Sequence, residues 1–321
     1  MAGQADIRKR GAAAVFAALA CAAFLLAGCG GRGFKVAIES GGADEKNPAL
    51  AAEQAPLVSE TTRQLPEPTA EEYERMGDGL LARGNLYLAY VNYEKALRLK
   101  PGSLGLEYKK GLALLLGGRN DDAIRQFEAV LKKDPKFELA HEGLGRAYFQ
   151  AGDLMQAERH LRKALALNHR LWKAYNTLGA IADRKGDFEQ AILEYTSAIA
   201  IAPNEGFLYN NLGVSCLTAG HHEAAVDAFA KAIRRNFRES KVFNNLGLAY
   251  GNLGRFEEAF EAFRLAGGEA HAHNNLGCIY LEKGMYAEAV KSFERAIALE
   301  PEYYARAAEN LKRAKALALT R

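Results

Sequence analysis

Small and apolar residues return at fixed places along most of the chain, in seven units that follow one another. A glycine marks each unit, usually after a leucine, and successive glycines lie 34, 34, 34, 34, 34 and 30 residues apart. A period of this length predicts an array of stacked supersecondary units, each too small to bury its own apolar face. The seven glycines are Gly77, Gly111, Gly145, Gly179, Gly213, Gly247 and Gly277.

Three further positions keep the same register within every unit. A second glycine follows the first by seven residues, an alanine comes five residues later, and a large residue lies four beyond the alanine, as in Gly220, Ala225 and Phe229. A proline ends four of the units, where it cannot continue a helix and can start the next segment. These prolines are Pro101, Pro135, Pro203 and Pro301.

This pattern resembles seven copies of the tetratricopeptide repeat (TPR) over residues 69–303. The resemblance implies an all-α fold, a TPR superhelix (α-solenoid) of about seven helix-turn-helix repeats. It also implies that the first glycine faces the alanine where the two helices cross, that the second glycine takes a positive φ in the turn, and that the large residue fills the space between neighbouring repeats. The expected repeat starts are Ala70, Leu104, Glu138, Trp172, Gly206, Ser240 and Ala270.

The last segment, residues 304–321, is expected to form a C-terminal capping helix over the seventh repeat. One stripe of the segment is apolar, while basic residues such as Lys312 and Arg313 lie mostly elsewhere. A basic helix at the end of the chain has an alternative role, which is contact with anionic lipid. The apolar stripe consists of Tyr304, Ala307, Ala308, Leu311 and Ala314.

The sixth repeat is four residues shorter than the others. Gly267 and Gly268 are expected to end its second helix a turn early. Two consequences are open. The deletion is either tolerated without effect, or it changes the pitch of the superhelix and reshapes the groove near repeats 6 and 7.

The N-terminus has the order of features found in bacterial lipoprotein signals. Arg8, Lys9 and Arg10 precede an apolar run over residues 11–26, which is short for a membrane span. The quartet at residues 26–29, Leu-Ala-Gly-Cys, resembles the lipobox, whose cysteine is acylated and becomes the first mature residue. We therefore expect residues 1–28 to be a lipoprotein signal peptide and Cys29 to carry the lipid. The alternatives are an ordinary signal peptide and a short membrane anchor.

Residues 29–68 are expected to be a flexible linker between that lipid and the repeats. The segment is rich in glycine and proline and has no sustained periodicity. A lipid anchor is a tether, so we expect the membrane to be reached through the lipid only. The resemblance to lipoproteins implies a place in the bacterial cell envelope, and Gly30 after the cysteine favours the outer membrane, facing the periplasm.

Composition and charge narrow the function. Charged residues make up 25% of the chain and the net charge is +3, of which +2 lies in the signal segment. We therefore expect no nucleic-acid partner. Four cysteines do not make a disulfide scaffold, and the sequence contains no recognised catalytic, cofactor or metal-binding motif. We expect a protein that is not an enzyme and uses no cofactor and no metal.

The first helices carry the candidate binding residues. In a TPR superhelix the second, fifth, sixth, ninth and twelfth residues of each first helix face the concave groove; we call these the groove positions. Amides there can pair with both halves of a peptide unit, or they can bond neighbouring helices instead. The amides are Asn176, Asn210, Asn211, Asn244, Asn245, Asn274 and Asn275, and the apolar candidates are Phe207, Val214, Leu217, Leu248 and Leu281.

These features together predict a non-enzymatic scaffold that binds protein or extended peptide segments in its groove. The combination resembles short lipidated TPR arrays of pilus and secretion machines, namely the TadD-type lipoproteins of the Flp/Tad pilus and the type IV pilotins. That resemblance implies a secretin or pilus assembly components as partners. The alternative is an envelope adaptor that recruits peptidoglycan hydrolases. The sequence does not predict the oligomeric state.

Overall fold

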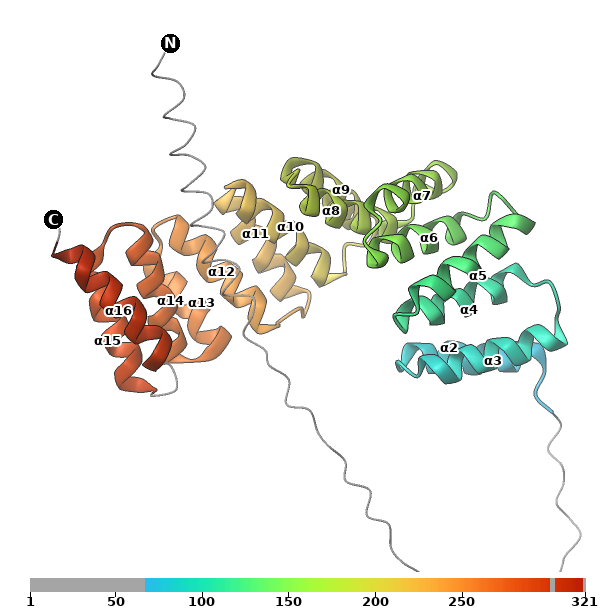
Figure 1. The fold of residues 1–321 in the computed structure, drawn as a ribbon, viewed down its shortest axis with the longest axis horizontal. Coiled ribbons are helices and arrows are strands. Elements are labelled where there is room, and N and C mark those ends of the chain that lie inside the picture. The colour runs from blue at the N-terminus through green and yellow to red at the C-terminus, as the bar shows by residue number, and fades with distance from the viewer. Residues whose placement is uncertain (1–66, 301–303, 320–321) are drawn as a thin grey trace, which may run out of the picture. The chain divides into compact units, whose positions relative to one another are not determined.

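The computed structural model describes residues 67–300 and 304–319, and these residues form fifteen helices and no strand (Figure 1). The all-α fold of seven helix pairs and one final helix is confirmed. The signal segment, Cys29 and nearly all of the linker lie outside the described residues. The helices are α2 (Ala70–Ala82), α3 (Leu86–Leu99), α4 (Leu104–Leu116), α5 (Asn120–Lys133), α6 (Glu138–Ala151), α7 (Leu154–Leu167), α8 (Trp172–Lys185), α9 (Phe188–Ile201), α10 (Gly206–Ala219), α11 (His222–Arg234), α12 (Ser240–Asn252), α13 (Phe256–Gly267), α14 (Glu269–Glu282), α15 (Tyr286–Leu299) and α16 (Tyr304–Ala318).

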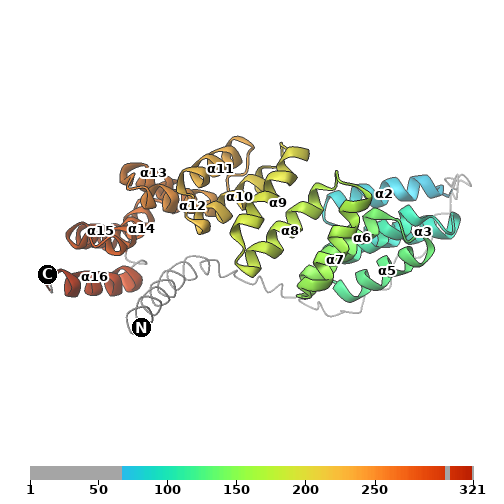
Figure 2. The ribbon, with the colours of Figure 1, turned by 90° about the horizontal axis from the view of Figure 1, so that it is seen from above.

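Neighbouring helices pack in chain order, and the first helix of a repeat also contacts the first helix of the next. Figures 1 and 2 show the helix pairs following one another along the array. Contacts between first helices join α4 to α6, α6 to α8, α10 to α12 and α12 to α14. An ion pair between Lys109 and Glu74 joins α4 to α2, and a hydrogen bond between Asn211 and Asn176 joins α10 to α8. The first helices therefore form one continuous layer, which carries the groove positions.

The first glycine of each repeat makes room for the large residue of the same repeat. A Cβ added at Gly213 would lie 2.6 Å from Phe229 Cε1, and one at Gly247 would lie 2.6 Å from Phe263 Cδ1. The alanines are buried at the crossing, and at Gly145 the carbonyl oxygen of Ala157 comes within 3.1 Å of an added Cβ, in line with the expected approach of glycine and alanine. The side chain nearest to each added Cβ is that of the large residue, which is a leucine in the third repeat and an aromatic ring in the others. Any side chain at these glycines would overpack the core.

The same large residue also contacts the next repeat, as expected. Phe127 is fully buried between two glycines, Gly111 of its own repeat and Gly143 of the following one. A Cβ at either glycine would lie 2.6 Å from an atom of the Phe127 ring. Leu144 and Ala147 of the next repeat belong to the same buried cluster. One ring thus joins two repeats.

The turns between the paired helices take the expected conformation. The second glycine has a positive φ in all seven repeats, for example 85° at Gly220. Residues with a Cβ rarely adopt this conformation, so the turn requires glycine. At the start of the array, Thr69 and Glu72 form a reciprocal capping box that begins α2.

The short sixth repeat loses little of its helix and nearly all of its loop. Helix α13 has 12 residues, whereas α9 and α15 have 14. Helix α14 begins directly after Gly268, whose φ of 90° and ψ of −179° lie in a region open essentially to glycine alone. The helix ends at Gly267 two residues shorter than α9 and α15, which is about half of the expected turn, and Gly268 by itself forms the connection.

Helix α16 lies against α15 and closes the array. Ala307 and Ala314 of its expected apolar stripe are fully buried, and Ala314 joins a cluster with Phe293 and Ala289 of the seventh repeat. Lys315 reaches out from the same helix to Glu294, 2.8 Å away. The helix covers the last repeat in the way that the sequence predicts.

Candidate binding groove

The apolar candidates of the groove are all half-buried, so each keeps part of its surface open. Val214 and Leu217 rest on the buried cluster around Phe229. Leu248 rests in the same way on the cluster of the sixth repeat, and Leu281 on that of the seventh. Phe207 lies against Trp172 of the preceding repeat, with 5.8 Å between ring centroids.

Two asparagine pairs link the first helices of different repeats. Asn211 Nδ2 donates to Asn176 Oδ1 at 3.0 Å, and Asn275 Nδ2 donates to Asn244 Oδ1 at 3.4 Å. His271 Nε2 lies 2.8 Å from the same Asn244 oxygen. The amides of these asparagines are therefore used, at least in part, to hold neighbouring repeats together.

Other amide groups at the groove positions keep unused hydrogen-bonding capacity. The side-chain oxygens of Asn210 and Asn274 are buried and have no hydrogen-bond partner. Asn245 is half-buried and forms no side-chain hydrogen bond within the described residues. Buried polar groups in proteins are nearly always paired, so these two closed-off oxygens are exceptions, whereas the half-buried Asn245 is the amide that a ligand in the groove could reach.

The first helices of repeats 1 and 2 carry ion pairs in place of amides. Lys109 Nζ lies 2.7 Å from Glu74 Oε1 and 2.8 Å from Asp78 Oδ2. Burial alone would lower the pKa of Lys109, but the hydrogen bonds to Asp78 and Glu74 outweigh burial and raise it. Tyr93, the large core residue of the first repeat, donates to Asp78 at 2.9 Å. One ammonium is thus shared by two carboxylates, so this end of the groove differs in chemistry from repeats 4–7.

Asp183 is a polar groove residue that sequence reasoning missed. It occupies the twelfth position of α8 and accepts hydrogen bonds from Tyr195 (2.9 Å) and from Ser215 of the next repeat (2.7 Å). Burial raises the pKa of Asp183, although both hydrogen bonds favour the ionised form. The only sequence signal for Asp183 as a groove residue was its place at a groove position. Asp183 fixes the register of α8 against α10.

A histidine pair in the third repeat was also missed. His141 of α6 is buried, and its Nδ1 lies 3.1 Å from Nδ1 of His160 in α7. His141 Nε2 donates to the carbonyl of Pro135 at 3.2 Å, which leaves Nδ1 of His141 as the acceptor and Nδ1–H of His160 as the donor. Nineteen residues separate the two histidines, and no motif links them.

Acid should therefore weaken the array through this pair. Burial, followed by the charge on His141, lowers the pKa of His160 to about 4, against about 6.5 in the unfolded chain. Because the unfolded chain binds the proton more tightly, stability falls as pH drops from about 6.5 to about 4, by on the order of 1–2 kcal/mol after screening. Urea unfolding across this range should show the loss, and His160→Gln should flatten it. An equally steep profile in the variant would contradict this role.

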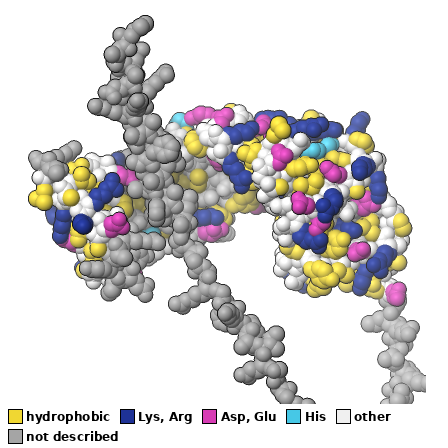
Figure 3. All heavy atoms as spheres, in the orientation of Figure 1, with side chains coloured by type: hydrophobic (Ala, Val, Ile, Leu, Met, Phe, Trp, Pro, Cys, Tyr) yellow, Lys and Arg dark blue, Asp and Glu magenta, His cyan; other side chains and the backbone are white. Residues whose placement is uncertain are grey.

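Several features concern the described residues as a whole. None of the described helices has the length and apolar character needed to cross a membrane. Cys216 is a buried free thiol. Within residues 67–300 and 304–319, no cluster of three or more histidine, cysteine or acidic residues forms a metal site. On the face shown in Figure 3, basic side chains are interspersed with acidic and apolar ones.

Comparison with known families identifies the helix pairs as a known type of repeat. A tetratricopeptide repeat profile matches residues 108–167, 143–206 and 210–271, and a second one matches residues 270–303. These matches cover more than half of the chain. The chain therefore belongs to the tetratricopeptide repeat family, whose members serve as protein-interaction scaffolds.

Individual relatives share the repeats and little else. The TPR repeat-containing thioredoxin TTL4 of Arabidopsis thaliana is 29% identical over 105 residues, which is 32% of this chain and 15% of that protein. Among solved structures, the APC/C hetero-tetramer Cut9-Hcn1 has a TM-score of 0.55 at 22% identity, covering 76% of this chain and 49% of that one. YrrB, a TPR protein with an unusual peptide-binding site, has a TM-score of 0.50 at 20% identity, covering 59% and 97%. At these identities the structures share the fold.

Proposed function

We propose that this protein is a lipid-tethered scaffold whose groove binds an extended segment of a protein partner. One observation carries the proposal, namely the unused amide of Asn245 among the half-buried apolar side chains at the groove positions of repeats 5–7. Asn245 is half-buried and has no side-chain hydrogen bond within the described residues, so both its oxygen and its N–H groups are unused. Peptide N–H and C=O groups are the matching donors and acceptors.

The surrounding side chains fit a peptide better than a small polar ligand. Half-buried apolar groups such as Val214, Leu217 and Leu248 accompany the amides along the same layer of helices. Amides paired with a peptide backbone give affinity without much sequence preference, and the apolar groups give pockets for alternate side chains. YrrB, which has a peptide-binding site on the same fold, supports peptide binding as a use of such arrays.

The lipid anchor and the role in assembling a pilus or secretion machine are proposals that rest on the sequence. The order of basic residues, apolar run and Leu-Ala-Gly-Cys quartet supports acylation of Cys29 and a place at the envelope, with Gly30 favouring the outer membrane. The resemblance to TadD-type lipoproteins and type IV pilotins supports assembly of a pilus or secretion machine. A scaffold anchored through a lipid on Cys29 would hold its partner near that membrane.

A groove variant tests the proposal against detergent-solubilised envelopes. Asn245→Arg places a bulky charge in the groove without removing any side-chain hydrogen bond among the described residues, so the fold should be kept and partner recovery should fall about tenfold. Thr196→Arg is the matched control, because it adds the same charge at an exposed position of a second helix. Recovery is measured by quantitative mass spectrometry of affinity-purified complexes.

The identity of the recovered proteins decides between the two envelope roles. A secretin or a pilus assembly component that is lost in Asn245→Arg and kept in Thr196→Arg supports the proposed machine. Recovery of peptidoglycan hydrolases alone would move the protein to the hydrolase-adaptor role. Equal recovery from both variants would contradict binding in the groove.

A further inference from the structure

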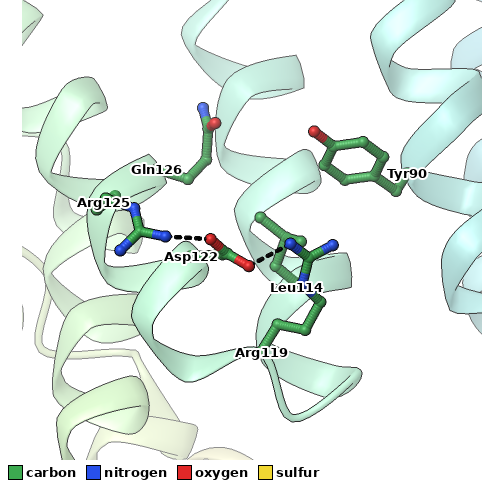
Figure 4. A pocket seen from close by; sticks show the side chains of 6 residues that line it. All are labelled: Tyr90, Leu114, Arg119, Asp122, Arg125 and Gln126. Atoms are coloured by element: carbon green, nitrogen blue, oxygen red, sulfur yellow. Dashed lines mark hydrogen bonds and ion pairs between the residues drawn. The ribbon is translucent and has the colours of Figure 1, made fainter.

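A hollow outside the groove lies at the junction of the first two repeats, between α3, α4 and α5. Its volume is about 230 Å³, and it is partly open to solvent. None of its lining residues occupies a groove position. Figure 4 shows the lining side chains, which are Tyr90, Leu114, Arg119, Asp122, Arg125 and Gln126.

The charges of this hollow do not balance. Arg119 and Arg125 lie on either side of Asp122 and bind one oxygen each, as the dashed lines of Figure 4 show. The hydrogen bond from Arg119 is the largest of the effects that lower the pKa of Asp122, so this carboxylate stays ionised. Two guanidinium groups thus share one carboxylate. Each guanidinium has five N–H donors, and most of them remain available.

A third cation stands next to the hollow at a place where the other repeats have an apolar residue. Lys110 occupies the seventh position of α4, where the other six repeats carry leucine or methionine. Lys110 is half-buried, and its ammonium lies 5.1 Å from the ring centroid of Tyr90, which lines the hollow. Leu114, one helical turn along the same face, lines it too. Lys110 forms no ion pair within the described residues.

We propose that this hollow is a second binding site, which takes the carboxylate of an acidic segment of a protein partner. Arginine presents its N–H groups as a planar fork that matches a carboxylate in a bidentate manner. A carboxylate that enters the hollow beside Asp122 would accept from the N–H groups of Arg119 and Arg125 that Asp122 leaves unused. With Lys110 counted, the cations exceed the carboxylates by two, and the partner's carboxylate would offset one of these charges. Tyr90 and Leu114 would contact its aliphatic stem.

The other repeats show that the arrangement is particular to the second one. Arg255 stands in the sixth repeat at the position of Arg119, and it pairs with Glu258 alone. The counterpart of Arg125 in that repeat is Glu261, which pairs with Arg264. Cations and carboxylates are therefore matched one to one there. Arg255 is the natural control for a test of Arg119.

The test is a calorimetric titration of the full-length protein in detergent with acetyl-Glu-Glu-Glu-amide. The neutral acetyl-Gln-Gln-Gln-amide and inorganic phosphate are the comparison probes, at one fixed ionic strength. We expect the glutamate peptide to bind and the glutamine peptide not to bind. The double variant Arg119→Gln with Arg125→Gln should lose about tenfold in affinity, while Arg255→Gln should bind as the parent protein does.

A second variant keeps the test independent of folding. Lys110→Leu restores the residue that most other repeats carry, so thermal stability should be kept or raised while affinity for the glutamate peptide falls several-fold. Three results would overturn the assignment. They are unchanged affinity in these variants, equal losses in Arg255→Gln, and binding of phosphate without binding of the peptide. The titration does not involve the groove, so its failure would leave the proposed function standing.

Discussion

Replacing Phe127 by alanine should destabilise the repeats around it by about 3–5 kcal/mol. The ring is fully buried and fills the space over Gly111 and Gly143, which belong to consecutive repeats. Neither glycine has a side chain that could move into the cavity, and the two backbones are held apart by their helices. Truncation should therefore leave a void that does not collapse, at the joint on which the stacking of repeats 2 and 3 depends.

Urea unfolding followed by far-UV circular dichroism would measure this loss, and hydrogen exchange would locate it. Protection should fall mainly in α4, α5 and α6, because a repeat array opens between neighbours. Leu193→Ala is the matched control, since Leu193 is 62% exposed and its truncation should cost little. A loss below about 1 kcal/mol for Phe127→Ala would show that the ring does not join the repeats.

Replacing Cys29 by serine should move the protein from the membrane fraction to the soluble fraction almost completely. None of the described helices could span a membrane, and the proposed lipid is the only anchor in this account. Cys29 lies outside the repeats, whose first helix begins after the Thr69 cap, so circular dichroism and thermal unfolding should be unchanged. Fractionation of cells followed by immunoblotting makes the measurement.

Cys278→Ser is the control for that experiment. Cys278 lies within α14, far along the chain from the signal segment, and its replacement should leave the protein in the membrane fraction. If the Cys29→Ser protein stays in the membrane fraction, acylation of Cys29 is not what holds the protein there. The short apolar run over residues 11–26 would then be the anchor to test.

The fold was predictable because the repeats impose the same constraint seven times. A glycine such as Gly220 recurs where the turn needs a positive φ, and the period of 34 residues sets the helix pairs. The side chain that lies nearest to the first glycine of each repeat was not predictable in the same way. Spacing places the alanine and the large residue on one face of the second helix, but side-chain length decides which reaches the glycine, and the ring of Phe229 does so.

The sequence predicted which residues lie at the groove positions, but it did not predict which hydrogen bonds their side chains form. The groove positions follow from the helix period, but an asparagine at such a position can bond a neighbouring helix or face outward. Asn211 bonds Asn176 across 35 residues of sequence, whereas Asn245 has no such partner. The His141–His160 pair joins two helices through a tertiary contact that no local pattern encodes. The sequence shows that Lys110 stands where the other repeats carry leucine or methionine. Only the structure shows that Lys110 lies near Arg119 and Arg125.

Site-specific photocrosslinking in cells tests the central claim, groove binding of an extended protein segment, most directly. A photoreactive amino acid is placed in turn at Asn211, Asn245 and Leu281, and at the exposed second-helix position Thr196 as a control. The crosslinked residues of the partner are then mapped by mass spectrometry. First helices of neighbouring repeats are about 10 Å apart, so each repeat corresponds to about three residues of extended chain.

We expect the three groove positions to crosslink to one partner, at sites that advance in order along a single segment, while the Thr196 position gives no crosslink to it. Crosslinks that scatter over the partner surface, or that form at Thr196 as strongly as in the groove, would contradict groove binding.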